Sequence, residues 1–153
     1  MIVVKRMANC ICGMLALAVV CVSLSAVSRA EDVFPKTAKR ILFLGDSITH
    51  AGDYISLVET QLRLHGHDAV LINLGLPSET CSGLSEPEHP FPRPNVHSRI
   101  DAALKKTNPD VVVACYGMND GIYYPFSEDR FLSYQLGIKQ IISKVNAVNA
   151  QLI

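Results

Sequence analysis

Cysteine is scarce in this chain once its first 30 residues are set aside, and that scarcity excludes several kinds of site. Three of the five cysteines, Cys10, Cys12 and Cys21, lie within those 30 residues. The other two, Cys81 and Cys115, match no metal-binding spacing, and one bridge between them would not form a disulfide framework. Cys115 lies in an apolar run, where a free cysteine usually behaves as a small buried hydrophobic residue. We therefore expect no metal, and whether the two cysteines pair stays open.

The chain also lacks net charge, repeats and low-complexity tracts. It holds 14 basic and 14 acidic residues. The first 30 residues contain three of the basic residues and no acidic one, so the remainder is mildly acidic. Such a balance gives no reason to expect nucleic acid as a partner. A length of 153 residues with 49% hydrophobic and 18% charged residues is typical of one globular domain with a real core.

The start of the chain has the order of a secretory signal peptide. Lys5 and Arg6 precede an uncharged run over residues 10–27, which is followed by Ser28, Arg29 and Ala30. This order predicts cleavage after residue 30 and a secreted or periplasmic domain over residues 31–153. A membrane anchor is the alternative, because the run is near the lower length limit for crossing a bilayer.

Apolar runs alternate with helical periodicities along the rest of the chain. The runs at residues 41–44, 70–72 and 111–116 predict three buried strands. Amphipathic stripes after each run predict helices near residues 55–62, 96–104 and 131–148. This alternation predicts a parallel sheet with helices on both faces. The loop over residues 77–94 is long, and such loops are usually functional or mobile.

Glycine and polar residues collect where the three strands end. Gly45-Asp46-Ser47 follows the first strand, Asn73-Leu74-Gly75 the second, and Gly117-Met118-Asn119-Asp120 the third. Ligands of parallel sheets bind beyond the carboxyl ends of the strands. The sequence therefore predicts a site at this edge.

The residue types at that edge suit acyl transfer. Ser47 would lie at a strand-to-helix turn, where its hydroxyl can attack a carbonyl carbon while N–H groups at the helix start stabilise the oxyanion. Gly75 offers an unshielded N–H, and Asn119 offers a neutral amide donor. The alternative is that Ser47 only caps the helix. Asp46 is expected to orient the turn through hydrogen bonds to main-chain N–H groups. Asp120 either caps the turn after the third strand or contacts substrate.

Two common fingerprints are absent from this edge. Thr49 replaces the second glycine of the Gly-x-Ser-x-Gly elbow of α/β-hydrolases. Gly45 and Gly52 do not make the Gly-x-Gly-x-x-Gly fingerprint of dinucleotide-binding proteins. We expect no cofactor.

The three blocks resemble those of the SGNH (GDSL) hydrolase family of esterases and acylhydrolases. "GDSIT" (45–49), "NLG" (73–75) and "YGMND" (116–120) occur in the family's order, each after a predicted strand. The resemblance implies Ser47 as nucleophile and Ser47, Gly75 and Asn119 as the oxyanion hole, with Gly45, Asp46, Gly117 and Asp120 in support. It also implies a flavodoxin-like three-layer α/β/α sandwich with strand order 2-1-3-4-5.

The sequence departs from the family at its fourth block. Asp-x-x-His, whose histidine is the general base, occurs nowhere in the chain. By the resemblance, the fourth strand would be starting at residues 151–153, so we expect the domain to be incomplete at its C-terminus, with its last strands missing. Glu86 and His89 have acid-x-x-His spacing but lie in the long loop, and His50 lies near Ser47 with no evident carboxylate partner.

Two functions follow from this pattern. The first is an exported serine esterase that hydrolyses a carboxylic ester, on a carbohydrate or a lipid, through an acyl-enzyme on Ser47. The alternative is an inactive remnant or a binding module without a general base. The sequence names neither the ester nor the oligomeric state.

Overall fold

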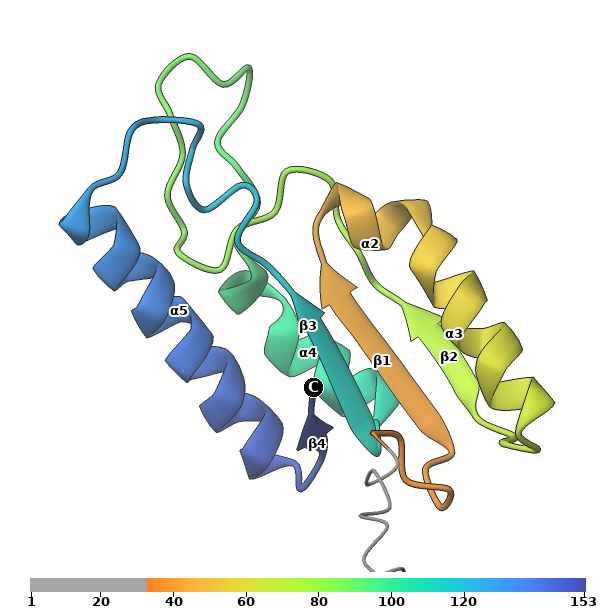
Figure 1. Cartoon of the computed structure of the whole chain (residues 1–153). Helices are drawn as coiled ribbons and strands as arrows, with labels where there is room; N and C mark the ends of the chain where they lie inside the picture. The colour runs from red at the N-terminus through yellow and green to blue at the C-terminus, as the bar shows by residue number, and fades with distance from the viewer. Residues whose placement is uncertain (1–32) are drawn as a thin grey trace, which may run out of the picture. The chain divides into compact units, whose positions relative to one another are not determined.

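The computed structural model describes residues 33–153, so the predicted signal peptide over residues 1–30 lies outside the described residues. The predicted strands and helices are all present (Figure 1). In chain order the elements are β1 (Arg40–Gly45), α2 (Ser47–Ala51), α3 (Asp53–Leu64), β2 (Val70–Asn73), η1 (Val96–Ser98), α4 (Ile100–Thr107), β3 (Val111–Cys115), α5 (Glu128–Ala147) and β4 (Gln151–Leu152).

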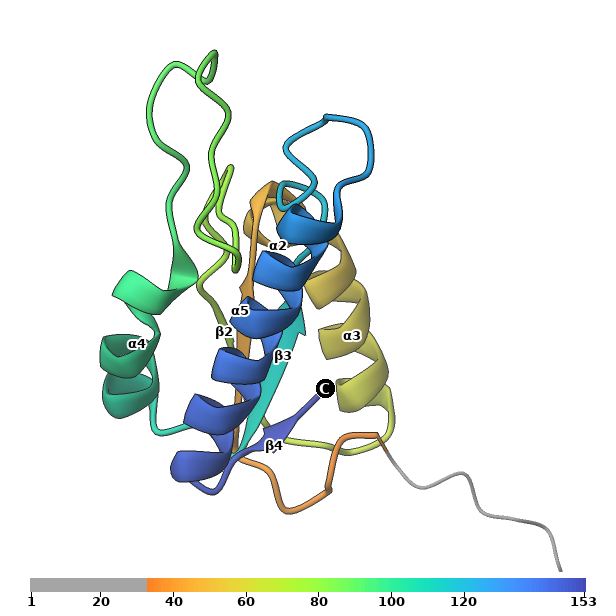
Figure 2. The same cartoon turned by 90° about the vertical axis from the view of Figure 1, so that its left-hand side faces the viewer.

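The described strands form one parallel sheet in the order β2-β1-β3-β4. Leu42 of β1 lies between Ile72 of β2 and Val112 of β3. Helices cover both faces of the sheet, with α3 on one side and α4 and α5 on the other (Figure 2). The predicted flavodoxin-like α/β/α sandwich is confirmed.

At the end of the chain, where the resemblance placed the start of a fourth strand, β4 pairs with β3 at Val111 and Val112. The main-chain N–H of Ala114 also donates to the carbonyl oxygen of Ile153 (3.0 Å). The chain turns back after α5 at Asn149, which has a φ of 56°. This turn lays the last residues beside the first half of β3.

Alternate residues of β1 face the two helical layers, because side chains of a strand alternate between faces. Leu42 and Leu44 belong to the core beneath α4 and α5. Ile41 and Phe43 belong to the core beneath α3. All four side chains are fully buried. The continuous apolar run at residues 41–44 is thus explained by a central strand covered on both sides.

Three positions fix where the helices end. Gly52, with a φ of 84°, separates α2 from α3, where the sequence suggested one helix. Gly66, with a φ of 72°, follows the C-terminal cap of α3. Asn108 takes a left-handed conformation just before Pro109 and ends α4. No helix within residues 33–153 combines the length and the apolarity needed to cross a bilayer.

Cys115 does not behave as expected. It is exposed, whereas the apolar run around it predicted a buried residue. It lies at the carboxyl end of β3, beyond the two residue pairs that β4 forms with this strand. Cys81 is buried, and both thiols are free.

Candidate active site

Ser47 follows the buried strand β1 directly and is the first residue of α2. The N-cap of this helix is Asp46, whose Oδ1 accepts a hydrogen bond from the N–H of Ile48 (2.9 Å). Asp46 is buried, whereas Ser47 is exposed. The Ser47 hydroxyl forms no hydrogen bond with any residue of the 33–153 region. Asp46, and not Ser47, therefore caps α2. The hydroxyl of Ser47 is not used for capping.

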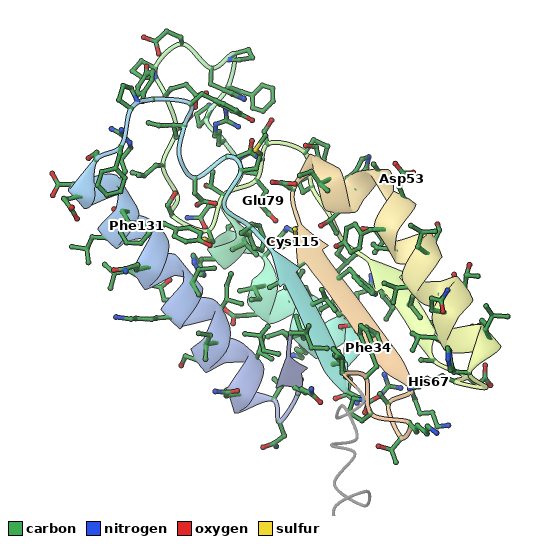
Figure 3. All side chains as sticks on the ribbon, in the orientation of Figure 1. Phe34, Asp53, His67, Glu79, Cys115 and Phe131 are labelled. Atoms are coloured by element: carbon green, nitrogen blue, oxygen red, sulfur yellow. The ribbon has the colours of Figure 1, made fainter. Side chains whose placement is uncertain are left out.

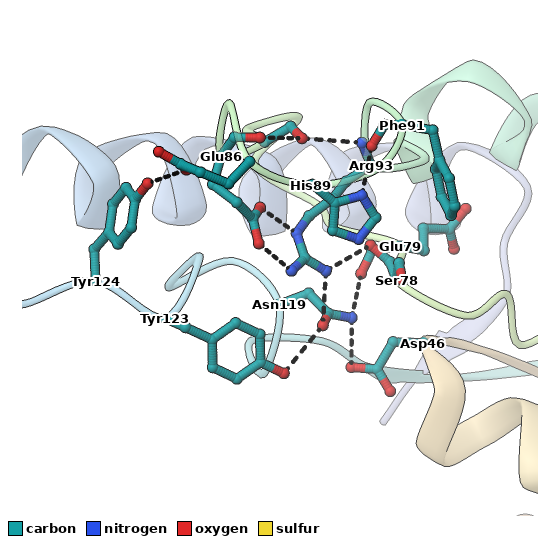
Figure 4. A network of polar contacts seen from close by, with 12 residues as sticks. Asp46, Ser78, Glu79, Glu86, His89, Phe91, Arg93, Asn119, Tyr123 and Tyr124 are labelled. Atoms are coloured by element: carbon teal, nitrogen blue, oxygen red, sulfur yellow. Dashed lines mark hydrogen bonds and ion pairs between the residues drawn. The ribbon is translucent and has the colours of Figure 1, made fainter.

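Asn119 lies beside this turn and brings the third block to the first (Figure 4). Its Nδ2 donates to Oδ2 of Asp46 (3.4 Å) and to the main-chain oxygen of Glu79 (3.2 Å). Its Oδ1 accepts from Nη1 of Arg93 (3.1 Å) and from the Tyr123 hydroxyl (3.4 Å). Donors on the oxygen side and acceptors on the nitrogen side fix the orientation of this buried amide. Its NH₂ group consequently faces the residue that precedes Ser47.

Arg93 reaches Asn119 from the long loop over residues 77–94. Its guanidinium forms a two-pronged ion pair with Glu86 (2.7 and 2.6 Å). These hydrogen bonds lower the pKa of Glu86 from 4.5 to about 2. The guanidinium also lies 5.6 Å from the ring centre of Tyr123. Arg93, a buried residue of this loop, thus fixes the position of the Asn119 amide at the carboxyl edge of the sheet.

Gly75 has a different environment from the one its predicted role needs. Its N–H donates to Oδ1 of Asn73 (2.9 Å), so an oxyanion on Ser47 would have to share that donor. A Cβ at Gly75 would lie 2.2 Å from the main-chain nitrogen of His50 in α2. The glycine therefore allows the second block to pack directly against α2. Three residues further on, Ser78 has a φ of 65°, and its N–H has no hydrogen-bond partner within the described region.

Glu79 anchors the start of the long loop beneath the site. Its fully buried carboxylate accepts two hydrogen bonds from Arg99 (both 2.6 Å) and one from the Tyr116 hydroxyl (2.6 Å). Arg99 also donates to the main-chain oxygen of Leu74. Figure 3 shows Glu79 and Cys115 near the carboxyl end of the sheet, with His67 at the opposite end. This ion pair fixes the main-chain oxygen of Glu79 that accepts from Asn119.

The supporting residues of the first and third blocks have structural contacts. Gly45 leaves room for Thr49, whose Oγ1 would lie 2.1 Å from a Cβ at this position. Gly117 has a φ of 130°, which favours glycine. Asp120 is buried, and its Oδ1 accepts from the N–H groups of Cys81 (2.9 Å) and Ser82 (2.7 Å). Asp120 therefore caps the start of the long loop, 39 residues earlier in the chain.

No histidine pairs with Ser47. All five histidines lie in the described region, and each has a ring nitrogen bonded to a main-chain oxygen. His50 contacts the oxygen of Gly75 (3.1 Å), and His89 contacts that of Phe91. Glu86 pairs with Arg93 instead of His89. Within residues 33–153, His, Cys, Asp and Glu side chains form no cluster suited to a metal ion.

Sequence reasoning missed the loop residues of this site. The length of the 77–94 segment indicated a functional loop, but nothing in the sequence paired Arg93 with Asn119. Glu79 was missed as well, because an acidic residue in a polar loop is usually exposed. Its burial depends on Arg99 and Tyr116, which lie 20 and 37 residues away.

Comparison with known proteins gives structural but not sequence matches. No protein-family model and no curated protein matches the chain. Among solved structures, the esterase EstA from Pseudoalteromonas sp. matches at 26% identity and a TM-score of 0.56, over 74% of this chain and 57% of EstA. The acetyl xylan esterase AlAXEase matches at 24% identity and a TM-score of 0.57, over 74% and 56%. A GDSL-like lipase from Bacteroides thetaiotaomicron VPI-5482 matches at 18% identity and a TM-score of 0.50, over 74% and 46%.

These matches place the chain within an α/β fold used by esterases. The structure of EstA is described as inhibited by monoethylphosphonate, and AlAXEase is described as an acetyl xylan esterase. The chain spans less than three fifths of the length of each of the three proteins. The shared fold agrees with the resemblance seen in the three sequence blocks.

Proposed function

We propose that this chain is the nucleophile-bearing part of an SGNH-type serine esterase, which hydrolyses a carboxylic ester of a small molecule. The observation that carries the proposal is the free hydroxyl of Ser47 at the start of α2. Asp46 takes over helix capping, and the NH₂ group of Asn119 faces the same turn. The fold shared with EstA supports the proposal.

The described residues supply parts of such a reaction. Ser47 would lose its proton and attack the ester carbonyl carbon, and the ester C–O bond would break so that the alcohol leaves with a proton. Water would then attack the acyl group on Ser47, which releases the carboxylic acid and restores the serine hydroxyl. Main-chain N–H groups near the start of α2 would stabilise the negative oxygen in each step. Asn119 would join them by exchanging its 3.4 Å hydrogen bond to Asp46 for one to that oxygen. Arg93 is a positioning residue, because it binds the amide of Asn119 and has no hydrogen bond to Ser47.

No described residue is placed to act as a general base for Ser47, and we therefore expect slow ester hydrolysis. A serine hydroxyl is a weak nucleophile unless a neighbouring group takes its proton. Each histidine is instead engaged with a main-chain oxygen. We expect the chain alone to hydrolyse p-nitrophenyl acetate barely above background.

Added imidazole tests the proposal, because it can serve as a soluble base. The protein-dependent rate of p-nitrophenyl acetate hydrolysis should rise with imidazole concentration, after subtraction of the rate with imidazole alone. Ser47→Ala should remove this rise. Ser56→Ala, a matched change of an exposed serine in the neighbouring helix α3, should keep it. An equal rise in the Ser47→Ala variant would rule out Ser47 as the nucleophile.

Export is the second part of the proposal. The basic start, uncharged run and small residues before position 31 support cleavage of residues 1–30. Expression in a cell with a secretory pathway should yield a protein that begins at Glu31. N-terminal sequencing that finds the uncharged run retained in a membrane fraction would contradict export by cleavage.

A further inference from the structure

Ser78 has an unusual main-chain conformation near the candidate active site. Its φ of 65° lies in the left-handed region, which glycine favours and serine rarely adopts. The N–H of Glu79 donates to the carbonyl oxygen of Leu76 (3.1 Å), so residues 76–79 form a tight turn. Proline at the second position of a turn and a positive φ at the third are typical of type II. Ser78 therefore occupies the strained position of a type II turn.

Both ends of this turn are fixed near Ser47. The N–H of Leu76 donates to the carbonyl oxygen of Gly45 (2.8 Å), two residues before Ser47. At the other end, Nδ2 of Asn119 donates to the main-chain oxygen of Glu79 (3.2 Å), and the same nitrogen faces the start of α2. The centre of the turn therefore lies at the edge of the sheet that carries the nucleophile.

Arg93 connects Ser78 to the amide of Asn119. Its Nη1 donates to the main-chain oxygen of Ser78 (3.5 Å) and to Oδ1 of Asn119 (3.1 Å), as Figure 4 shows. One guanidinium nitrogen thus contacts both residues. The N–H of Ser78 itself has no hydrogen-bond partner within residues 33–153.

The positive φ of Ser78 decides which way this N–H points. Type I and type II turns differ mainly by a flip of their central peptide, which here joins Pro77 to Ser78. In a type I turn, which serine adopts without strain, that peptide would present its oxygen where the type II turn presents its N–H. Strain of this kind is often stored at functional sites.

A main-chain N–H beside a nucleophile can stabilise an oxyanion if nothing else occupies it. The N–H of Gly75, which the sequence suggested for this role, already donates to Asn73. We propose that Ser78, in place of Gly75, donates to the oxyanion that forms when Ser47 attacks an ester. This role rests on the proposed function, whereas binding of an anion by the same N–H does not require hydrolysis.

Replacing the peptide N–H by an ester oxygen tests the donor directly. Glyceric acid in place of Ser78, in the full chain, removes the N–H and keeps the side chain. The Ser47-dependent, imidazole-assisted hydrolysis of p-nitrophenyl acetate should fall at least about tenfold. The melting temperature should change little, because this N–H has no partner in the described fold.

Glycolic acid in place of Gly75 is the comparison, because it removes the rival N–H. It should lower the hydrolysis rate much less than the change at Ser78 does. A larger loss of rate at position 75 than at position 78 would overturn the proposal. If the ester variants do not fold, anion binding by the unchanged chain decides.

Anion binding is measured by titrating methylphosphonate into the unchanged full chain. The amide proton of Ser78 should move downfield in NMR spectra, together with the side-chain NH₂ of Asn119. The amide of Ser56 is the control, because it is bonded to the oxygen of Gly52 at the start of α3 and should not move. Absence of a shift at Ser78, or a shift at Gly75 in its place, would overturn the proposal.

Ser47→Ala separates this proposal from the proposed function. The variant keeps every main-chain donor, so methylphosphonate should still shift the amide of Ser78. A shift at Ser78 without any Ser47-dependent hydrolysis would mean that the esterase proposal fails while the anion site stands. Ser47-dependent hydrolysis that survives loss of the Ser78 N–H would mean that the esterase proposal holds while the role of Ser78 fails.

Discussion

Asn119 and Asp46 lie 73 residues apart in sequence, and Nδ2 of Asn119 is 3.4 Å from Oδ2 of Asp46. The second oxygen of the same carboxylate caps the helix that begins at Ser47. Asp46 therefore fixes two parts of the site at once, namely the start of α2 and the amide that faces it. This relationship explains why a buried carboxylate precedes an exposed serine.

Asp46→Ala should destabilise the fold by about 1–3 kcal/mol, because it removes a helix cap and leaves the buried NH₂ group of Asn119 with one acceptor fewer. The free energy of unfolding in urea measures this effect. Asp53→Ala is the matched control, since Asp53 is an exposed acidic residue in the first turn of α3 and makes no capping contact. Asp53→Ala should lower the free energy of unfolding by only about 0.3–1 kcal/mol. Equal losses in the two variants would contradict the structural role of Asp46.

Gly75→Ala should be strongly destabilising. The added methyl group would lie 2.2 Å from the nitrogen of His50 and 2.6 Å from the carbonyl carbon of Thr49, which are main-chain atoms that cannot move aside alone. Overpacking of this kind costs about 1–3 kcal/mol, and the displaced α2 would carry Ser47 with it. Gly121→Ala is the control, because a Cβ at Gly121 meets no atom within 4 Å. A melting temperature unchanged by Gly75→Ala would show that the second block does not pack against α2 as described.

Because of the ion pair between Glu86 and Arg93, the free energy of unfolding should depend on pH in the acidic range. Hydrogen bonds from Arg93 hold the pKa of Glu86 at about 2, below its ordinary 4.5. A carboxylate with a lowered pKa stabilises the fold above its unfolded pKa and loses this contribution as pH falls through the folded one. The difference in stability between the unchanged chain and Glu86→Gln should therefore be full at pH 7 and shrink between about pH 4.5 and pH 2.

Urea titrations at pH 7 and at pH 3 measure that difference. Glu59→Gln is the control, because it removes an exposed ion pair with Arg63 on α3 and should change stability little at either pH. A difference for Glu86→Gln that grows toward acid would contradict the ion pair.

The two thiols of the described region should differ in reactivity. Burial raises the pKa of Cys81, and the neighbouring Asp120 raises it further. Cys115 is exposed. Iodoacetamide at pH 8 should therefore modify Cys115 and spare Cys81 in the native protein, because the thiolate is the reactive form. Peptide mapping by mass spectrometry distinguishes them, and equal modification of both residues would contradict the described burial.

Much of the fold could be predicted from the sequence because local signals agree with the final structure. The apolar run at residues 41–44 predicted a strand buried on both faces, and Leu42 and Phe43 do face opposite helical layers. The pairing of β4 with β3 was expected only from the family resemblance, because the two residues of β4 carry no strand periodicity of their own. The exposure of Cys115 was missed for a related reason, because strand periodicity does not say how far a neighbouring strand extends.

The candidate site was predictable only where it follows the strands. Ser47 and Asn119 come directly after β1 and β3, so the parallel sheet brings them to one edge. Arg93 and Glu79 belong to a long loop whose path is set by contacts with residues far away in sequence. The hydrogen bond from the Gly75 N–H to Asn73 could not be predicted from the sequence either, because it depends on how the loop turns after β2.

The most direct test of the central claim, that Ser47 is a nucleophile without its base, compares three proteins in p-nitrophenyl acetate hydrolysis. They are the chain itself, the chain extended by a C-terminal esterase segment that carries Asp-x-x-His, and the Ser47→Ala variant of the extended chain. The extension should raise the rate at least about a hundredfold, and Ser47→Ala should remove the gain. Full activity in the unextended chain, or an equal gain with and without Ser47, would contradict the claim.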